Sequence, residues 1–169
     1  MNYLLLNTGK LLDFQTISQM YQDNITLNNT NTSVNLGTLT FNLKSPGNMI
    51  ALSGIANYNL SINVPDVTTA IVGPLSLTIT RNGDIKTGTT VYDSIAQYTN
   101  RSMLTNNIEY DSGQFLPFEF VDTPPITSCN STVTYTLTLS VPSSLTPGVA
   151  YQLIRNELYY SFSGAEIQQ

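Results

Sequence analysis

The sequence predicts an all-β fold, a two-sheet antiparallel jelly-roll sandwich of about eight to ten strands. Three observations support this prediction. Several segments alternate apolar and polar residues with a period of two, firm turn signals separate those segments, and no segment sustains the 3.6-residue apolar period of a helix. Many short strands without intervening helices are typical of a sandwich or a barrel.

The alternation is clearest in Val133–Val141, where every odd position is apolar and every even position carries a hydroxyl. Such a segment is a half-buried strand, because successive side chains leave a strand on opposite faces. Leu75–Thr80 and Asn59–Val64 repeat the pattern. The remaining candidate strands are Leu11–Ile17, Val34–Leu43, Met49–Ile55, Ile85–Tyr92, Gln114–Val121, Val149–Ile154 and Glu157–Phe162. Within Val34–Leu43 the apolar positions change register at Gly37, which predicts a β-bulge there.

Turn residues separate these strands. Asn82-Gly83 favours a two-residue type I′ turn, so Leu75–Thr80 and Ile85–Tyr92 should pair as an antiparallel hairpin. The segment Asp93–Leu104 is compatible with a helical turn. An immunoglobulin-like sandwich is the alternative fold, although the chain has no Trp and only one Cys, whereas that fold usually buries a Trp against a disulfide.

The chain divides into an N-terminal arm or connector, residues 1–12, and a jelly-roll domain, residues 13–169. The arm contains four consecutive apolar residues, Tyr3, Leu4, Leu5 and Leu6. One interpretation is a connector that inserts into a neighbouring subunit; the simpler one is a first edge strand. Tyr159 and Tyr160 join the arm as candidate assembly residues, because adjacent strand positions face opposite ways and only one of the two can lie in a single core.

The residues that most enzymes need are missing. The chain contains no His and only one Cys, which removes the commonest general base and the usual zinc ligands. No nucleophile elbow and no phosphate-binding glycine loop occurs. We therefore expect no enzymatic activity, no cofactor and no metal. A hydrolase that uses only carboxylates is the remaining enzymatic alternative. The lone Cys129 lies in a polar segment and is a candidate thiol for a bond between chains.

The composition points to a polar surface of low charge. Charged residues make up 10% of the chain, whereas Ser, Thr and Asn together form roughly a third. Such a surface suits close packing between neighbours at the outside of a particle. The net charge is -5 and the six basic residues are dispersed, so we expect neither nucleic acid nor a membrane as a partner. The N-terminus lacks the pattern of a secretory signal.

Several segments together carry a family resemblance. They are Leu39-Thr40-Phe41 leading to Ser45-Pro46-Gly47, the Ala56–Val64 strand, Leu75–Ile79 ending at Asn82-Gly83, and the closing strand Leu158–Phe162. In this order the chain resembles, from about residue 13 onward, the tumour-necrosis-factor/complement-type jelly-roll domains of bacterial spore-surface proteins of the exosporium or endospore appendages. The collagen-like stalk of many such proteins is missing.

The resemblance implies a homotrimer, possibly a polymer, that packs flat apolar and Tyr-bearing faces around a three-fold axis. It implies a structural subunit of a spore-surface layer or appendage fibre, with copies of itself and other surface-layer or fibre proteins as partners. The expected location is a spore or particle surface. The alternatives are a phage or virion fibre and a receptor- or glycan-binding head domain.

Overall fold

The computed structural model describes residues 9–63, 73–97, 112–155 and 157–168. These residues form strands and loops, and no helix lies among them. The strands are β1 (Lys10–Met20), β2 (Ile25–Asn28), β3 (Ser33–Leu43), β4 (Met49–Asn63), β5 (Leu75–Arg81), β6 (Thr89–Gln97), β7 (Ser112–Asp122), β8 (Ser131–Ser140), β9 (Ala150–Leu153) and β10 (Tyr159–Gln168).

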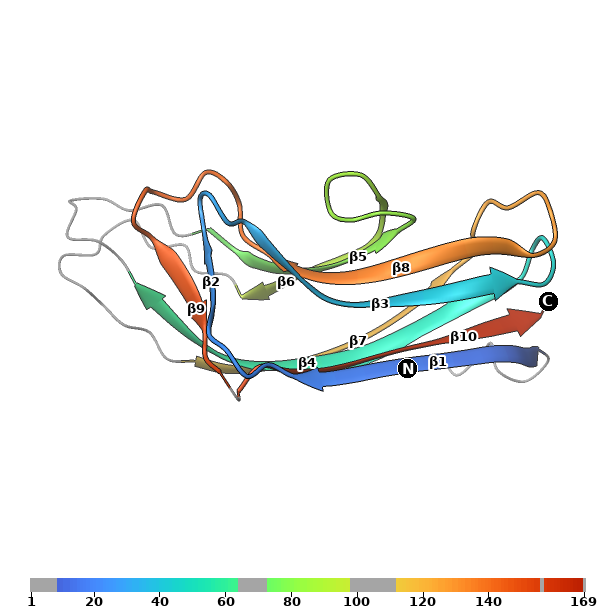
Figure 1. Ribbon diagram of the computed structural model, residues 1–169, viewed down its shortest axis with the longest axis horizontal. Helices are drawn as coiled ribbons and strands as arrows, with labels where there is room; N and C mark the ends of the chain where they lie inside the picture. The colour runs from blue at the N-terminus through green and yellow to red at the C-terminus, as the bar shows by residue number, and fades with distance from the viewer. Residues whose placement is uncertain (1–8, 64–72, 98–111, 156, 169) are drawn as a thin grey trace.

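The strands form two sheets that pack face to face (Figure 1). The 6-stranded sheet has the order β1-β10-β4-β9-β2, with β7 on the other edge of β4. The 4-stranded sheet has the order β3-β8-β5-β6 and lies above it in the view of Figure 1. The predicted all-β sandwich of two antiparallel sheets is confirmed.

The pairing identifies the sandwich as a jelly roll. β1 pairs with β10, β2 with β9, β3 with β8, β4 with β7 and β5 with β6, all antiparallel. The first strand therefore pairs with the last, the second with the second-last, and so on to the middle of the chain. This is the pairing of one long hairpin that is folded over on itself. The immunoglobulin order, in which strand A pairs with B and F with G, is not the order found among the described strands.

β4 is one strand of 15 residues where the sequence predicted two, Met49–Ile55 and Asn59–Val64. The prediction was wrong between Ile55 and Asn59, where the strand continues without a break. A Cβ at Gly54 would lie 2.5 Å from the Phe118 ring, so the glycine makes room for an aromatic side chain of β7. The length of β4 allows it to pair with β10 over its first part and with β9 over its last.

The predicted bulge at Gly37 is confirmed. The register between β3 and β8 shifts between Asn35 and Gly37, so Leu36 is the extra residue. Because of this shift, Leu36 and Leu39 are both buried, 3% exposed, although they lie three positions apart.

The hairpin between β5 and β6 differs from the predicted two-residue turn. The strands pair antiparallel as expected, but β6 begins at Thr89 rather than Ile85. The Asp84 carboxylate accepts hydrogen bonds from the backbone N–H groups of Lys86 and Thr87, which holds these residues in a turn of their own. The helical turn expected over Asp93–Leu104 is wrong for Asp93–Gln97, which belong to β6; residues 98–104 lie outside the described part.

Other strand boundaries also differ from the predicted ones. β2 was not predicted, and β10 extends to Gln168 rather than ending at Phe162. β1 begins at Lys10, so residues 10–12 of the predicted arm belong to this strand, and Lys10 and Leu11 pair with β10.

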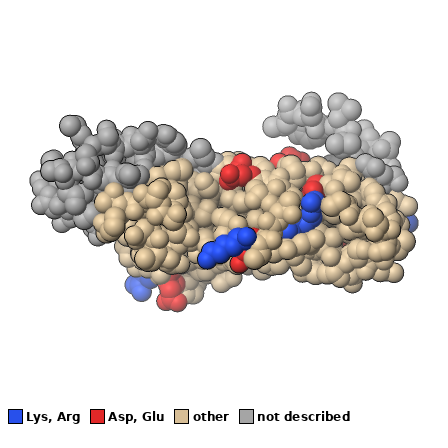
Figure 2. All heavy atoms as spheres, turned by 90° about the horizontal axis from the view of Figure 1, so that it is seen from above, with Lys and Arg blue, Asp and Glu red and all other residues tan. Residues whose placement is uncertain are grey.

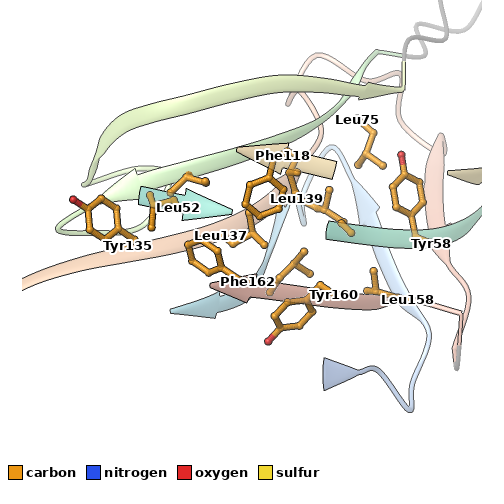
Figure 3. Close-up of a cluster of buried hydrophobic side chains, with 14 of the residues drawn as sticks. Leu52, Tyr58, Leu75, Phe118, Tyr135, Leu137, Leu139, Leu158, Tyr160 and Phe162 are labelled. Atoms are coloured by element: carbon orange, nitrogen blue, oxygen red, sulfur yellow. The ribbon is translucent and has the colours of Figure 1, made fainter. Parts of the chain in front are cut away.

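The core lies between the two sheets (Figure 3). Its largest fully buried side chains include Tyr58 from β4, Tyr135 from β8 and Phe162 from β10. The Phe118 and Phe162 rings pack with centroids 5.9 Å apart, and those of Phe41 and Tyr135 with centroids 6.3 Å apart.

Polar side chains join the two sheets at both lateral edges of the sandwich. On the β1 side, Gln15 accepts a hydrogen bond from the Thr40 N–H at 3.1 Å and donates one to the Thr40 carbonyl, so its amide satisfies the backbone of the edge strand β3. On the other side, Arg81 Nη1 from β5 bonds both carboxylate oxygens of Asp122 at the end of β7, at 2.7 and 2.8 Å. Tyr135 Oη donates to the same carboxylate at 2.7 Å.

Candidate assembly surface

The outward side of β1, β10, β4 and β7 forms one continuous surface, which we call the outer face. The register places its residues in four rows across the strands. The rows are Met20–Tyr159–Asn57–Phe115, Ser18–Ser161–Ile55–Pro117, Thr16–Ser163–Ser53–Glu119 and Phe14–Ala165–Ala51–Val121.

The first and last rows carry large exposed apolar side chains on the edge strands. Phe14 is 58% exposed and Phe115 is 65% exposed. Met20, Tyr159 and Val121 are exposed as well, at 47%, 38% and 37%. Among the described residues every exposed large hydrophobic side chain lies on β1, β7 or β10, that is, on strands of one sheet. A clustered apolar surface of this kind marks an interaction site more often than scattered exposure does.

The two middle rows consist mainly of small polar residues. Thr16 and Ser163 hydrogen-bond to one another through their hydroxyls at 2.8 Å, so part of their polarity is already satisfied within the chain. Glu119 is the one charged residue in the four rows, which contain no Lys and no Arg. Covering this surface therefore requires little desolvation of charge.

The outer side of the 4-stranded sheet is different in kind. Neighbouring polar side chains are bonded to each other there: Thr38 to Thr136 at 3.2 Å, Thr138 to Asn35 at 3.0 Å, Thr132 to Asn42 at 2.9 Å and Thr78 to Asp93 at 3.2 Å. Figure 2 views the molecule from this side and shows a few scattered charged side chains on an otherwise uncharged surface.

The structure separates the two candidate tyrosines. Tyr159 lies on the outer face, and Tyr160 is fully buried, with its ring centroid 6.2 Å from that of Tyr21. Burial raises the pKa of the Tyr160 hydroxyl. Tyr159 is therefore the member of the pair that a neighbouring subunit can reach. The other outer-face residues with large apolar side chains, Phe14, Met20, Phe115 and Val121, were not singled out from the sequence.

The remaining candidates lie elsewhere. Tyr3, Leu4, Leu5 and Leu6 are outside the described residues. The described chain begins at Gly9, where an added Cβ would lie 2.3 Å from Cγ2 of Ile167. Ile167 is on the same side of β10 as Ala165, so the arm joins the domain at the end of the outer face. Cys129 carries an exposed free thiol in the loop between β7 and β8.

The buried carboxylates of the described residues have structural partners. Asp122 accepts the hydrogen bonds from Arg81 and Tyr135 given above. Glu166 Oε1 accepts hydrogen bonds from the Lys44 N–H at 2.8 Å and from Asn48 Nδ2 at 2.6 Å, which ties the β3–β4 loop to β10. In the described part of the chain, no group of three or more metal-ligating side chains is brought together. Nor does that part contain a helix long and apolar enough to cross a membrane.

The fold and this surface define a jelly-roll sandwich with one apolar outer face. No protein-family model and no curated protein matches the sequence. Among solved structures, the chain is similar to the infectious bursal disease virus VP2 subviral particle, with 17% identity over 92% of this chain and 40% of that chain, and a TM-score of 0.33.

Two further structures of the same virus are similar to a comparable degree. The T13 viral particle has 15% identity over 92% of this chain and 38% of that chain, with a TM-score of 0.34, and the Gx strain has 12% identity over 92% and 39%, with a TM-score of 0.36. The chain thus spans about two fifths of the length of each, as those coverages state. These scores are low, so the jelly-roll assignment is based on the strand pairing.

Proposed function

We propose that this chain is a non-enzymatic structural subunit that assembles with copies of itself at the surface of a particle. The observation that carries the proposal is the outer face, where Phe14, Met20, Phe115, Val121 and Tyr159 are exposed on one sheet. Exposed apolar area of this extent is costly in water and is stabilised when another surface covers it.

The side chains that the fold buries also favour a structural role. Asp122 and Glu166, the buried carboxylates of the described chain, hold strands and a loop in place. A glycosidase-type mechanism needs two carboxyl groups that face a substrate, whereas these two accept hydrogen bonds from within the fold.

The assembled unit is a homotrimer, and it forms part of a spore-surface layer or an appendage fibre. The apolar arm Tyr3–Leu6 connects one copy to the next. The described chain begins at Gly9, beside Ile167, which is compatible with this role. Other surface-layer or fibre proteins are the expected further partners. The exposed Cys129 is available for a bond between chains.

A subunit of a phage or virion is the second candidate, because a low-charge, Ser/Thr/Asn-rich surface suits that particle equally. A receptor- or glycan-binding head is less favoured. Such a head needs aromatic and carboxylate side chains gathered at one end of the sandwich, whereas the exposed aromatic residues of the described chain are spread over a sheet face.

Native mass spectrometry and light scattering of the full chain test the proposal. We expect trimers or larger assemblies at micromolar concentration. A chain that stays monomeric at about 100 μM would overturn the proposal, since interfaces of useful strength are saturated at that concentration. Comparing assemblies with and without reductant tests Cys129. Immunogold labelling of spores and of phage from the source culture separates the two particle types.

A further inference from the structure

The pattern of residues on the outer face also specifies how two copies meet. The large apolar side chains lie on the edge strands, with Phe14 and Met20 on β1 and Phe115 and Val121 on β7. The middle strands carry mostly small residues, among them Ala165, Ser163, Ala51 and Ser53. A neighbour that covers the face therefore gains most of its apolar contact along the two edges.

An extended sheet across two copies is disfavoured. β7 pairs only with β4 among the described strands, and it carries Pro117 in its middle. Proline has no N–H to donate, so a strand added beside β7 would lose a ladder hydrogen bond there. The copies are therefore expected to pack by their faces and not to join by hydrogen bonds between edges.

We infer that the outer face covers the same face of a second copy, with β1 of one copy against β7 of the next around an axis parallel to the strands. The inference rests on the proposed self-assembly. A face can cover the same face of a second copy only through a two-fold axis, and a two-fold axis in this direction keeps each row level with itself. This contact joins two copies and is separate from the three-fold packing of the proposed trimer. Met20 then meets Phe115 of the neighbour, and Phe14 meets Val121, so large apolar side chains contact one another at both ends.

The same arrangement is compatible with the charge on the face. Glu119 shares its row with Thr16, at the opposite edge. Row-preserving packing of β1 on β7 therefore places each Glu119 against a neighbour's Thr16 hydroxyl and keeps the two Glu119 carboxylates apart. Two copies consequently meet without like-charge repulsion.

The size of the face limits its strength. Four strands about 4.8 Å apart and seven residues of about 3.4 Å each give a face of roughly 19 by 24 Å. Two copies thus cover about 900 Å² in total, which is below the 1,200–2,000 Å² of most stable interfaces. The face alone therefore supports a weak contact.

Charge substitutions at the predicted Thr16–Glu119 contact test the inference. Thr16→Glu places two carboxylates together across the interface and should weaken association about 100-fold, because like charges that face each other at an interface cost several kcal/mol. Adding Glu119→Lys should restore association to within about tenfold of the wild type. Sedimentation equilibrium of the full chain measures both.

The matched control is Thr40→Glu, an exposed threonine on the outer side of the 4-stranded sheet, which should leave association unchanged. Thermal unfolding of each variant verifies that it folds. Thr16→Glu association equal to that of the wild type, or a double variant that stays dissociated, would overturn the inferred contact while leaving self-assembly intact. A monomeric wild type would overturn both proposals and leave the face to a partner of another kind.

Discussion

β8 and β1 illustrate how differently the two sheets use their outward positions. β8, in the 4-stranded sheet, directs Thr132, Thr136 and Thr138 outward, and each is hydrogen-bonded to a side chain of β3. β1, in the 6-stranded sheet, directs Phe14 and Met20 outward, both about half exposed or more. The inner sides are alike, since both strands belong to sheets that bury aliphatic and aromatic residues in one core.

The difference teaches that alternation alone does not say which side of a sheet meets water. A row of threonines whose hydroxyls bond Thr or Asn side chains of the neighbouring strand has its polar groups satisfied within the chain. A face with exposed Phe and Met leaves apolar area in contact with water until another surface covers it. The proposed self-assembly therefore rests on the contrast between the two outer sides, and the following experiments test that contrast.

Alkaline pH should produce the largest effect, because each sheet buries a tyrosine. Burial raises the pKa of Tyr58 in β4 and of Tyr135 in β8, and the Asp122 carboxylate raises that of Tyr135 further. A pKa that is higher in the folded state gives stability that is fully present below pH 10 and is lost above it. At pH 12 each tyrosine that stays protonated in the folded state lowers the free energy of unfolding by about 2.7 kcal/mol, or by about 5 kcal/mol for both. Absorbance at 295 nm with circular dichroism should show these tyrosines ionising only as the fold is lost; ionisation of both near pH 10 in an intact fold would contradict this.

Asp122→Asn should have the next largest effect. It removes one of the two acceptor oxygens that join the sheets and leaves the largely buried Arg81 guanidinium without its charge partner, which lowers the free energy of unfolding by about 3 kcal/mol. Urea unfolding measures the loss. The exposed Asp23→Asn serves as the control and should change stability by less than about 0.5 kcal/mol. Equal stability of the two variants would argue against the link.

A matched pair of Tyr→Phe variants compares the two sheets from inside. Tyr135→Phe removes a hydrogen bond to a carboxylate and should cost about 2 kcal/mol. Tyr58→Phe should be neutral or slightly stabilising, because the Tyr58 hydroxyl is buried with no hydrogen-bond partner among the described residues. A reversed order of the two variants in chemical unfolding would show that Tyr58 has a partner after all.

Substitutions on the two outer sides should give the smallest but most discriminating effects. Thr138→Val removes the bond to Asn35 and should cost about 1 kcal/mol of unfolding free energy without changing assembly. Phe14→Thr should change the unfolding free energy by less than about 0.5 kcal/mol, since the side chain is 58% exposed, and should weaken assembly. Light scattering that shows dissociation by Thr138→Val and not by Phe14→Thr would contradict the different roles of the two outer sides.

The sequence predicted the fold class well, because Val133–Val141 and Leu75–Thr80 alternate cleanly and no helical period competes with them. It predicted the bulge at Gly37 for the same reason: a change of register is visible when one face is strictly apolar. Apart from the antiparallel pairing of β5 with β6, the strand pairing could not be predicted, because partners that are far apart in the chain leave no local signal.

The outer face was missed for a related physical reason. In β1, Phe14 points outward and Ile17 inward, so the segment carries apolar residues on both faces, and the sequence alone does not say which of them are covered. The irregularity between Leu11 and Asp13 adds to the ambiguity. The signal that could have found the face is the combination of large apolar residues on both parities in Leu11–Ile17 and in Gln114–Val121.

The nested strand pairing also sets the order in which the domain can be completed. Among the described strands, β5 and β6 are the only neighbours in the sequence that pair, so a local hairpin can form first there, and each later pairing joins strands from farther apart. β10 leaves the ribosome last of the described strands, yet it lies between β1 and β4 in the middle of the outer face. A chain still being synthesised therefore lacks the central strand of its contact surface. Neighbouring nascent chains cannot associate through that surface before folding is complete.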